Sequence, residues 1–192
     1  MLPTTIPRLL ARMAESYPDT PAQYMKQSDG SFIPRSYSEL REEADRFAAG
    51  LSTIGVKRGD HVGLISENRP EWLVADLGIQ SLGAADVPRG NDSMADELAY
   101  ILGFSECGTV IVENEAQLRK VAGVADEIKT LRQFVVLDRE FSRDQAQALA
   151  AELGSLFRRV RVHTYDAVVE AGREHLARHP EFVTTEVEQG QG

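Results

Sequence analysis

Residues 59–72 read Gly-Asp-His-Val-Gly-Leu-Ile-Ser-Glu-Asn-Arg-Pro-Glu-Trp, in which a short apolar run is followed at once by signals for the start of a helix. The run His61–Ile65 shows no polar alternation after His61, which is typical of a strand buried on both faces. Pro70 suits the first turn of a helix, and Glu71 favours its positive end. This stretch therefore predicts one strand–helix unit, with the helix over about residues 71–82.

The same unit recurs along the chain. Further apolar runs at 84–87, 109–112 and 134–137 are each followed by a helical pattern, at about 93–102, 115–125 and 142–153. A fifth strand is predicted at 160–163, with a helix over about 165–177. Strands spaced about two dozen residues apart, with helices between them, indicate βαβ crossovers. The sequence thus predicts an α/β fold, a doubly wound and mainly parallel sheet with helices on both faces.

The first part of the chain has a different pattern. A helix is predicted over residues 6–17, followed by a β-hairpin with strands at 23–26 and 31–34 around Asp29-Gly30. Pro34 lacks a backbone donor, so the hairpin is expected at a sheet edge. Ser36 and Glu39 form a capping box that opens a helix to about residue 54, where Gly55 supplies the left-handed stop.

The chain has no clear linker between residues 35 and 178, so one domain is predicted. Residues 184–192 are polar and aperiodic and are interpreted as a loop or frayed tail. We therefore expect an α/β subdomain over residues 1–183 and a tail over residues 184–192.

Composition excludes several classes of function. The 192 residues include 21 basic and 30 acidic side chains, and the net charge of -9 disfavours binding to nucleic acid or to an anionic membrane. The densest basic cluster, Arg158, Arg159 and Arg161, is interpreted as a solvated surface. Cys107 is the only cysteine, so no internal disulfide can form. With no secretory leader and no long apolar run in the sequence, a cytoplasmic protein is expected.

Familiar catalytic motifs do not emerge. Neither the Gly-x-Gly-x-x-Gly fingerprint nor a P-loop occurs. The segment Gly103–Gly108 is one glycine away from a nucleophile elbow, but a helix precedes it and a strand follows, which is the reverse of the required order. His175 and His179 are spaced like two metal ligands on a helix but lack an intervening glutamate, and they are interpreted as solvated. The acidic pairs Glu42-Glu43 and Glu113/Glu115 are interpreted as helix-face and loop charges.

Two loops at the predicted carboxyl ends of strands are candidates for ligand contact. Residues 66–71 follow the first buried strand, although capping by Asn68 and the helix-start residues also explain this stretch. In the segment 84–93 the strand is expected to stop at Pro88, and polar residues then lead to a cap at Ser93. Arg89 is the candidate residue for lining a cleft there.

Several phrases, in a consistent order over residues 5–140, resemble the amino-terminal region of the adenylate-forming (AMP-binding) acyl-CoA synthetases. Residues 36–40, Ser-Tyr-Ser-Glu-Leu, are similar to the first core motif of that family, Leu-Thr-Tyr-x-Glu-Leu, although Arg35 departs from the usual leucine. Residues 66–72 look like the fatty-acyl-CoA branch. Residues 82–88, Leu-Gly-Ala-Ala-Asp-Val-Pro, resemble the second core motif, and Arg89-Gly90 departs from its common sequel.

The resemblance implies an amino-terminal part of an enzyme that uses ATP, CoA and Mg²⁺ to activate a fatty acid, most similar to the long-chain fatty-acid–CoA ligases. The phosphate loop of the family, its Tyr-Gly-x-Thr-Glu motif, its ribose-binding aspartate and its carboxy-terminal lysine have no counterparts in this sequence. No catalytic residue, cofactor-binding residue or metal ligand is therefore assigned, Arg89 remains only a cleft candidate, and these residues alone are expected to be inactive and to bind no cofactor.

Two alternative interpretations of the sequence remain open. In the first, the enzyme activates another carboxylate, such as an aryl acid or an amino acid. In the second, the chain is a non-catalytic, flavodoxin-like binding module. If an apolar face is left uncovered, a homodimer through that face is expected.

Overall fold

The computed structural model describes residues 5–27, 29–152, 154 and 160–190. Its elements in chain order are α1 (Ile6–Ser16), β1 (Pro21–Lys26), β2 (Phe32–Ser36), α2 (Tyr37–Thr53), β3 (His61–Ile65), α3 (Pro70–Ser81), β4 (Ala85–Arg89), α4 (Ala95–Phe104), β5 (Thr109–Val112), α5 (Glu115–Ala122), β6 (Gln133–Val136), α6 (Arg143–Glu152), β7 (Arg161–Thr164), α7 (Tyr165–Arg178) and α8 (Phe182–Gln189).

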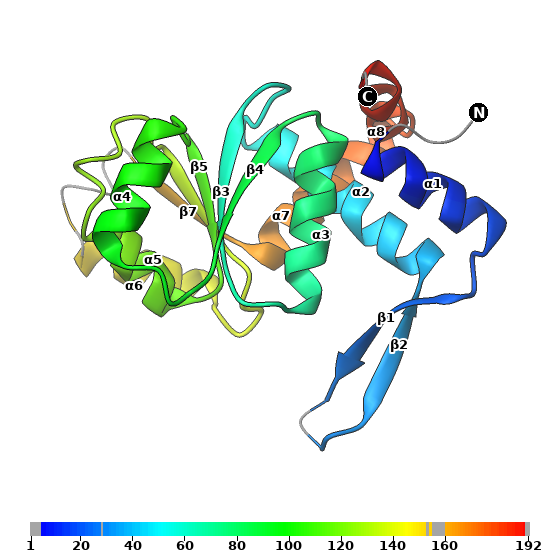
Figure 1. The fold of residues 1–192 in the computed structure, drawn as a ribbon, viewed down its shortest axis with the longest axis horizontal. Coiled ribbons are helices and arrows are strands. Elements are labelled where there is room, and N and C mark those ends of the chain that lie inside the picture. Colours follow the sequence, from blue (N-terminus) through cyan, green and yellow to red (C-terminus); the bar gives the residue numbers. More distant parts are fainter. Residues whose placement is uncertain (1–4, 28, 153, 155–159, 191–192) are drawn as a thin grey trace.

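Five strands form one parallel sheet in the order β4-β3-β5-β6-β7. Helices cover both faces, with α2, α3 and α7 on one side and α4, α5 and α6 on the other (Figure 1). Successive side chains along β5 and β6 alternate between the two hydrophobic cores, so that Ile111 and Val135 meet the first layer and Val110 and Phe134 meet the second. The predicted doubly wound α/β architecture is confirmed.

The hairpin of β1 and β2 is a two-stranded sheet of its own and projects from the body of the molecule below α2 (Figure 1). Its turn is the predicted one, with Gly30 at a φ of 84° and the Asp29 carboxylate accepting from the Ser31 amide at 2.9 Å. Pro34 pairs with Tyr24. Both strands of a two-stranded sheet are edges, so the missing donor of Pro34 is tolerated.

The strand β4 continues through Pro88, where the sequence predicted that it would stop. The Ala85 amide donates to the Asp60 carbonyl at 2.9 Å, so by alternation the backbone groups of Val87 and Arg89 also face β3, whereas those of Pro88 face outward. Because β4 is the edge of the sheet, the proline interrupts no ladder hydrogen bond. The predicted cap at Ser93 is also wrong, since α4 starts one residue later and has Met94 as its N-cap.

The predicted tail at 184–192 is wrong for most of its length, because α8 occupies Phe182–Gln189 and the expected boundary after residue 183 falls inside this helix. Val183 is buried in the first core, and Val187 packs against it. These valines are one helical turn apart, so together they give an otherwise polar segment an apolar stripe. Arg58 also forms an ion pair with Glu186 at 2.9 Å.

The helices α2 and α7 cross with almost no space between their backbones. A Cβ atom at Gly172 would lie 1.7 Å from the Arg46 carbonyl oxygen, and one at Gly50 would lie 2.0 Å from the Val168 carbonyl oxygen. Both distances are far below van der Waals contact, so only glycine permits this crossing. It fixes α7, and with it the end of β7, against the helix that follows the hairpin.

Asp45 of α2 lines a groove between α1, α2 and α8, with Arg41 Nε 3.6 Å from its carboxylate. Burial raises the pKa of Asp45 to about 6, although Arg41 opposes this shift. The unfolded chain would release this proton near pH ~4. The folded state therefore holds the proton more tightly, so its stability rises as the pH falls through about 6 and declines as the pH rises through that value.

We expect Asp45→Asn to raise the free energy of unfolding by about 1 kcal/mol at about pH 8 and to change it little at about pH 4. Thermal denaturation of both proteins at the two pH values measures this difference. A stabilisation of equal size at both would contradict the assignment to Asp45 ionisation.

Candidate ligand site at the carboxyl edge of the sheet

The strand order of the sheet indicates where a ligand-binding crevice is expected. The chain leaves β3 toward β4 on one side and then crosses back to β5 on the other side of β3. In open α/β sheets, ligands bind outside the carboxyl ends of the strands at such a switch point. Here that position lies between the ends of β3 and β5, where Ser66–Asn68 and Glu113 emerge.

Glu113 ties together the loops at this crevice. Its carboxylate accepts from the Glu67 amide at 2.8 Å, from Asn91 Nδ2 at 3.3 Å and from Asn114 Nδ2 at 3.4 Å. These donors come from the loops after β3, β4 and β5, respectively. The sequence pattern predicts only a helix-face or loop charge for Glu113. Its position directly after a fully buried strand was the signal that it lies at this edge.

Beside this cluster, a hollow of about 280 Å³ opens between the loops after β3 and β4. It is lined by Ser66, Glu67, Asn68, Trp72, Pro88, Arg89 and Gly90. Arg89 is exposed, and within the described residues its guanidinium donates only to the neighbouring Pro88 carbonyl, at 2.9 Å. The residue singled out from the sequence therefore lies at the expected edge with a guanidinium available to solvent, and its contact with a ligand stays a prediction.

The loop after β3 uses its residues partly for structure. Pro70 occupies the first turn of α3 as predicted, but the N-cap is Arg69, without a side-chain cap, so the capping predicted for Asn68 is not formed. Arg69 instead bonds to Glu71 at 2.9 Å. Asn68 remains exposed at the mouth of the hollow.

Beneath the loop lies an ionic network of Arg35, Glu43, Glu71, Arg139 and Tyr165. Glu43 accepts from Arg35 at 3.0 Å, from the Tyr165 hydroxyl at 2.7 Å and from Arg139. Arg139 also reaches Glu71 at 3.5 Å and stacks over the Tyr165 ring, 4.8 Å from its centroid. Burial, together with the neighbouring Glu43 carboxylate, raises the pKa of Tyr165 well above its ordinary value, so the phenol stays a donor. The network connects the hairpin to the starts of α3 and α7.

Other candidates from the sequence fall away from this edge. Cys107 is buried between α4 and β5, and burial raises the pKa of its thiol to about 12, which keeps it protonated and unreactive. His175 and His179 face each other at the end of α7 with ring centroids 4.8 Å apart, beside Phe182. His61 begins β3 and its Nδ1 lies 2.9 Å from the Ser105 carbonyl. Of the basic cluster, Arg158 and Arg159 lie outside the described residues.

Within the described ranges, no helix combines the length and the apolar composition that are needed to cross a bilayer.

The sequence and the fold were each compared with known proteins, and both comparisons point to one family. Residues 10–177 match the profile of the family described as AMP-binding enzyme. A chloroplastic long-chain-fatty-acid–[acyl-carrier-protein] ligase of Arabidopsis thaliana is 29% identical over 90% of this chain and 22% of its own length. A long-chain-fatty-acid–CoA ligase of Xenopus laevis is 29% identical over 69% of this chain and 18% of its own length.

Among solved structures, the A-PCP didomain of a carboxylic acid reductase from Segniliparus rugosus, in complex with AMP, superposes with a TM-score of 0.74. The match covers 87% of this chain and 26% of that one at 22% identity, which establishes a shared fold. The chain thus spans about a fifth of the length of the curated relatives it matches. The fold superposes on that of a solved relative. Since the family profile extends over most of the sequence, this chain belongs to the AMP-binding enzymes, the adenylate-forming acyl-CoA and carboxylate ligases.

Proposed function

We propose that this chain forms the amino-terminal α/β subdomain of an AMP-forming ligase that activates a long-chain fatty acid. In the proposed reaction, the fatty carboxylate attacks the α-phosphorus of ATP to give acyl-adenylate and pyrophosphate. The thiol of CoA then attacks the acyl carbon, and AMP leaves. The observation that carries the proposal is the family match over residues 10–177, supported by relatives named for long-chain fatty acids.

The proposed contribution of these residues is to build one wall of the active-site cleft. The crevice between β3 and β5 presents exposed polar groups, and Arg89 offers a guanidinium beside it. Such a group would attract an anionic substrate toward the cleft. The groups that handle phosphates in the family have no counterpart in this sequence, so no bond-making step is assigned to these residues.

The residues present do not fit a Mg²⁺ site. Glu113, the carboxylate at the switch point, is already engaged by three N–H groups. Across the part of the chain that the structure describes, no three metal-ligating side chains come together. We therefore propose that any Mg²⁺ of the reaction is held by residues outside this chain.

ATP–pyrophosphate exchange tests the proposal. The purified 192-residue chain is expected to show no acid-dependent exchange with palmitate, whereas the product of the same gene that includes any sequence after residue 192 is expected to be active. Measurable turnover by the 192-residue chain would refute the subdomain assignment. A longer product that contains a phosphate loop but exchanges with no carboxylate would refute the ligase assignment.

The choice of carboxylate needs its own comparison, because a solved relative with the same fold is a carboxylic acid reductase. A panel of palmitate, benzoate and single amino acids, assayed with the longer product, is expected to show the highest kcat/KM for palmitate. A preference for benzoate or an amino acid would replace the fatty-acid proposal with the alternative named from the sequence.

A further inference from the structure

A hollow of about 570 Å³ lies where α7 ends and α8 begins. It lies toward the amino-terminal edge of the sheet, because Glu186, which lines it, pairs with Arg58 of the segment that leads into β3. The switch-point crevice lies at the carboxyl ends of the strands. The hollow is therefore separate from the proposed active-site cleft.

Two of the four histidines of the chain meet in this hollow. His175 belongs to the last turn of α7, and His179 is the C-cap residue of the same helix. The His179 amide donates to the His175 carbonyl at 2.9 Å, which closes the turn between them. Their ring centroids lie 4.8 Å apart, with an angle of 41° between the ring planes. The spacing in the sequence allowed a shared helix face, and the structure brings the two rings together.

The separation of the rings is that of two imidazoles bound to one metal ion. A metal–nitrogen bond of about 2.0–2.1 Å places each ring centre about 3.2 Å from the ion, so two rings at a bond angle of about 90–110° have centres about 4.5–5.2 Å apart. The observed 4.8 Å falls within this range. The inclination of the ring planes also shows that the contact is not a face-to-face stack.

The ring nitrogens of the pair are open to a ligand. Among the residues that the structure describes, no hydrogen bond is formed by the side chain of either His175 or His179. His179 is exposed and His175 is half-buried, so an ion can reach the space between them from the solvent. The two imidazoles are therefore available as ligands.

The orientation of one ring is set by a neighbour from the core. Phe182 contacts His175 edge to face, with ring centroids 4.7 Å apart, and itself packs against the first hydrophobic core. A ligand that is already held in place loses less conformational freedom when it binds. Phe182 thus prepares His175 for coordination.

The charges around the pair favour a cation. The last turn of a helix carries partial negative charge, and Glu181 adds an exposed carboxylate to the same hollow. Glu186 is already paired with Arg58. Arg178 opposes a cation, but its Nε donates to the Glu174 carbonyl of its own helix, at 3.2 Å.

We propose that His175 and His179 together bind one Zn²⁺ ion or a similar divalent transition-metal ion. Imidazole nitrogen is a preferred ligand of Zn²⁺, Ni²⁺ and Cu²⁺, whereas Mg²⁺ and Ca²⁺ prefer oxygen. The described residues bring no third metal-ligating side chain to the pair, so water fills the remaining coordination positions. The ion joins the last turn of α7 to its C-cap residue, and the proposal does not depend on the fatty-acid reaction.

Titration with ZnCl₂ of the 192-residue chain, made without a histidine tag, tests this site. At about pH 7.5 an ordinary imidazole is largely neutral and free to coordinate. Isothermal calorimetry is expected to give one site with a Kd on the order of 10 μM. The ¹H–¹⁵N signals of residues around 175–182 are expected to shift with Zn²⁺, and MgCl₂ at the same concentration is expected to leave them in place.

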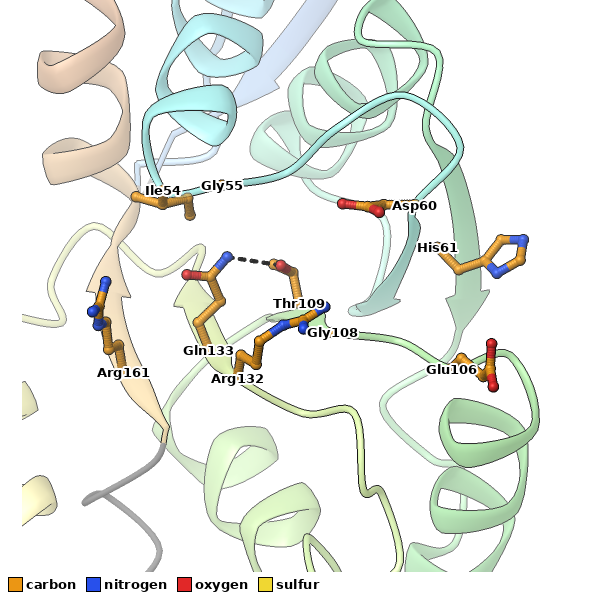
Figure 2. Close-up of a pocket in the computed structure, with 10 residues that line it drawn as sticks. All are labelled: Ile54, Gly55, Asp60, His61, Glu106, Gly108, Thr109, Arg132, Gln133 and Arg161. Carbon is orange, nitrogen blue, oxygen red and sulfur yellow. Dashed lines mark hydrogen bonds between the residues drawn. The ribbon is translucent and has the colours of Figure 1, made fainter.

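Variants of single histidines sharpen the test. Loss of an outer partner of a metal ligand already costs about 10–100-fold in affinity, so His175→Gln and His179→Gln should each weaken Zn²⁺ binding by about tenfold or more. His61→Gln is the matched control and should leave the Kd unchanged. His61 is an exposed histidine in the wall of a separate cavity, of about 330 Å³, and its Nδ1 lies 2.9 Å from the Ser105 carbonyl (Figure 2).

Each outcome decides the proposal. Shifts confined to the end of α7 and the start of α8, with binding weakened in the two α7 variants and kept in His61→Gln, would support the site. Equal weakening in His61→Gln, shifts spread over other surfaces, or the same shifts with Mg²⁺ would overturn it, and so would the absence of any response to Zn²⁺. Because the spectra of the unaltered chain locate the ion, the test does not depend on the variants folding.

Discussion

Gly172→Ala is expected to lower the free energy of unfolding by about 3 kcal/mol and the Tm by about 10 °C. Helix propensity alone predicts the opposite sign, since alanine stabilises a helix interior by about 1 kcal/mol relative to glycine. The added Cβ, however, would lie 1.7 Å from the Arg46 carbonyl oxygen and 2.7 Å from the Gly50 amide nitrogen. Both neighbours are backbone atoms, which cannot rotate away, so α2 and α7 would have to separate.

Gly123→Ala is the matched control for this prediction. Gly123 is the C-cap of α5 with an ordinary helical φ of -62°, and a Cβ there would be 3.4 Å from its nearest neighbour, which is normal contact. Urea denaturation of the three proteins measures the effect. If the Gly172→Ala protein were as stable as the Gly123→Ala protein, this result would contradict the close backbone contact between α2 and α7.

Glu43→Ala is expected to lower the free energy of unfolding by about 2 kcal/mol, after allowance for partial exposure of the network. The side chain of Glu43 is 17% exposed and that of its partner Arg35 only 11%, so the substitution leaves a largely buried guanidinium without its carboxylate. The Tyr165 hydroxyl also loses its acceptor. The cost comes mainly from the groups left behind rather than from the lost attraction.

The neighbouring Glu42 supplies the comparison. It is 62% exposed and pairs with Arg46 on the surface of the same helix, so Glu42→Ala should cost less than about 0.5 kcal/mol. Tyr165→Phe removes one hydrogen bond from the network and should cost about 1 kcal/mol. Thermal unfolding of the three variants measures their losses of stability. Equal losses of stability from Glu42→Ala and Glu43→Ala would show that the network around Glu43 stabilises the fold no more than a surface ion pair does.

Local patterns in the sequence predicted most elements because their signals are short in range. The apolar run His61–Ile65, the capping box at Ser36 and the turn at Asp29-Gly30 each depend on residues within a few positions of one another. The alternation of strands and helices then restricted the architecture to a doubly wound sheet, and the structure agrees.

The failures have physical causes that a local pattern does not contain. The end of β4 was misplaced because tolerance of Pro88 depends on β4 being an edge, which only the strand order reveals. The helix α8 was missed because two valines in a polar segment do not by themselves indicate a helix. They stabilise one here because they pack against the first hydrophobic core, which the local sequence does not reveal. Glu43 and Tyr165 are 122 positions apart, so no spacing rule could have joined them.

The outward side of β4 has a consequence for how copies of this protein meet at high concentration. Of its two outward-facing positions, 86 and 88, only Asp86 has an N–H group to offer, and its carboxylate brings negative charge to that rim. A strand of another copy that aligned along this edge would meet one backbone N–H donor, at Asp86, instead of two. It would also have to approach the Asp86 carboxylate. Edge-to-edge pairing of copies through β4 is therefore disfavoured by Pro88, the same proline that this edge strand tolerates.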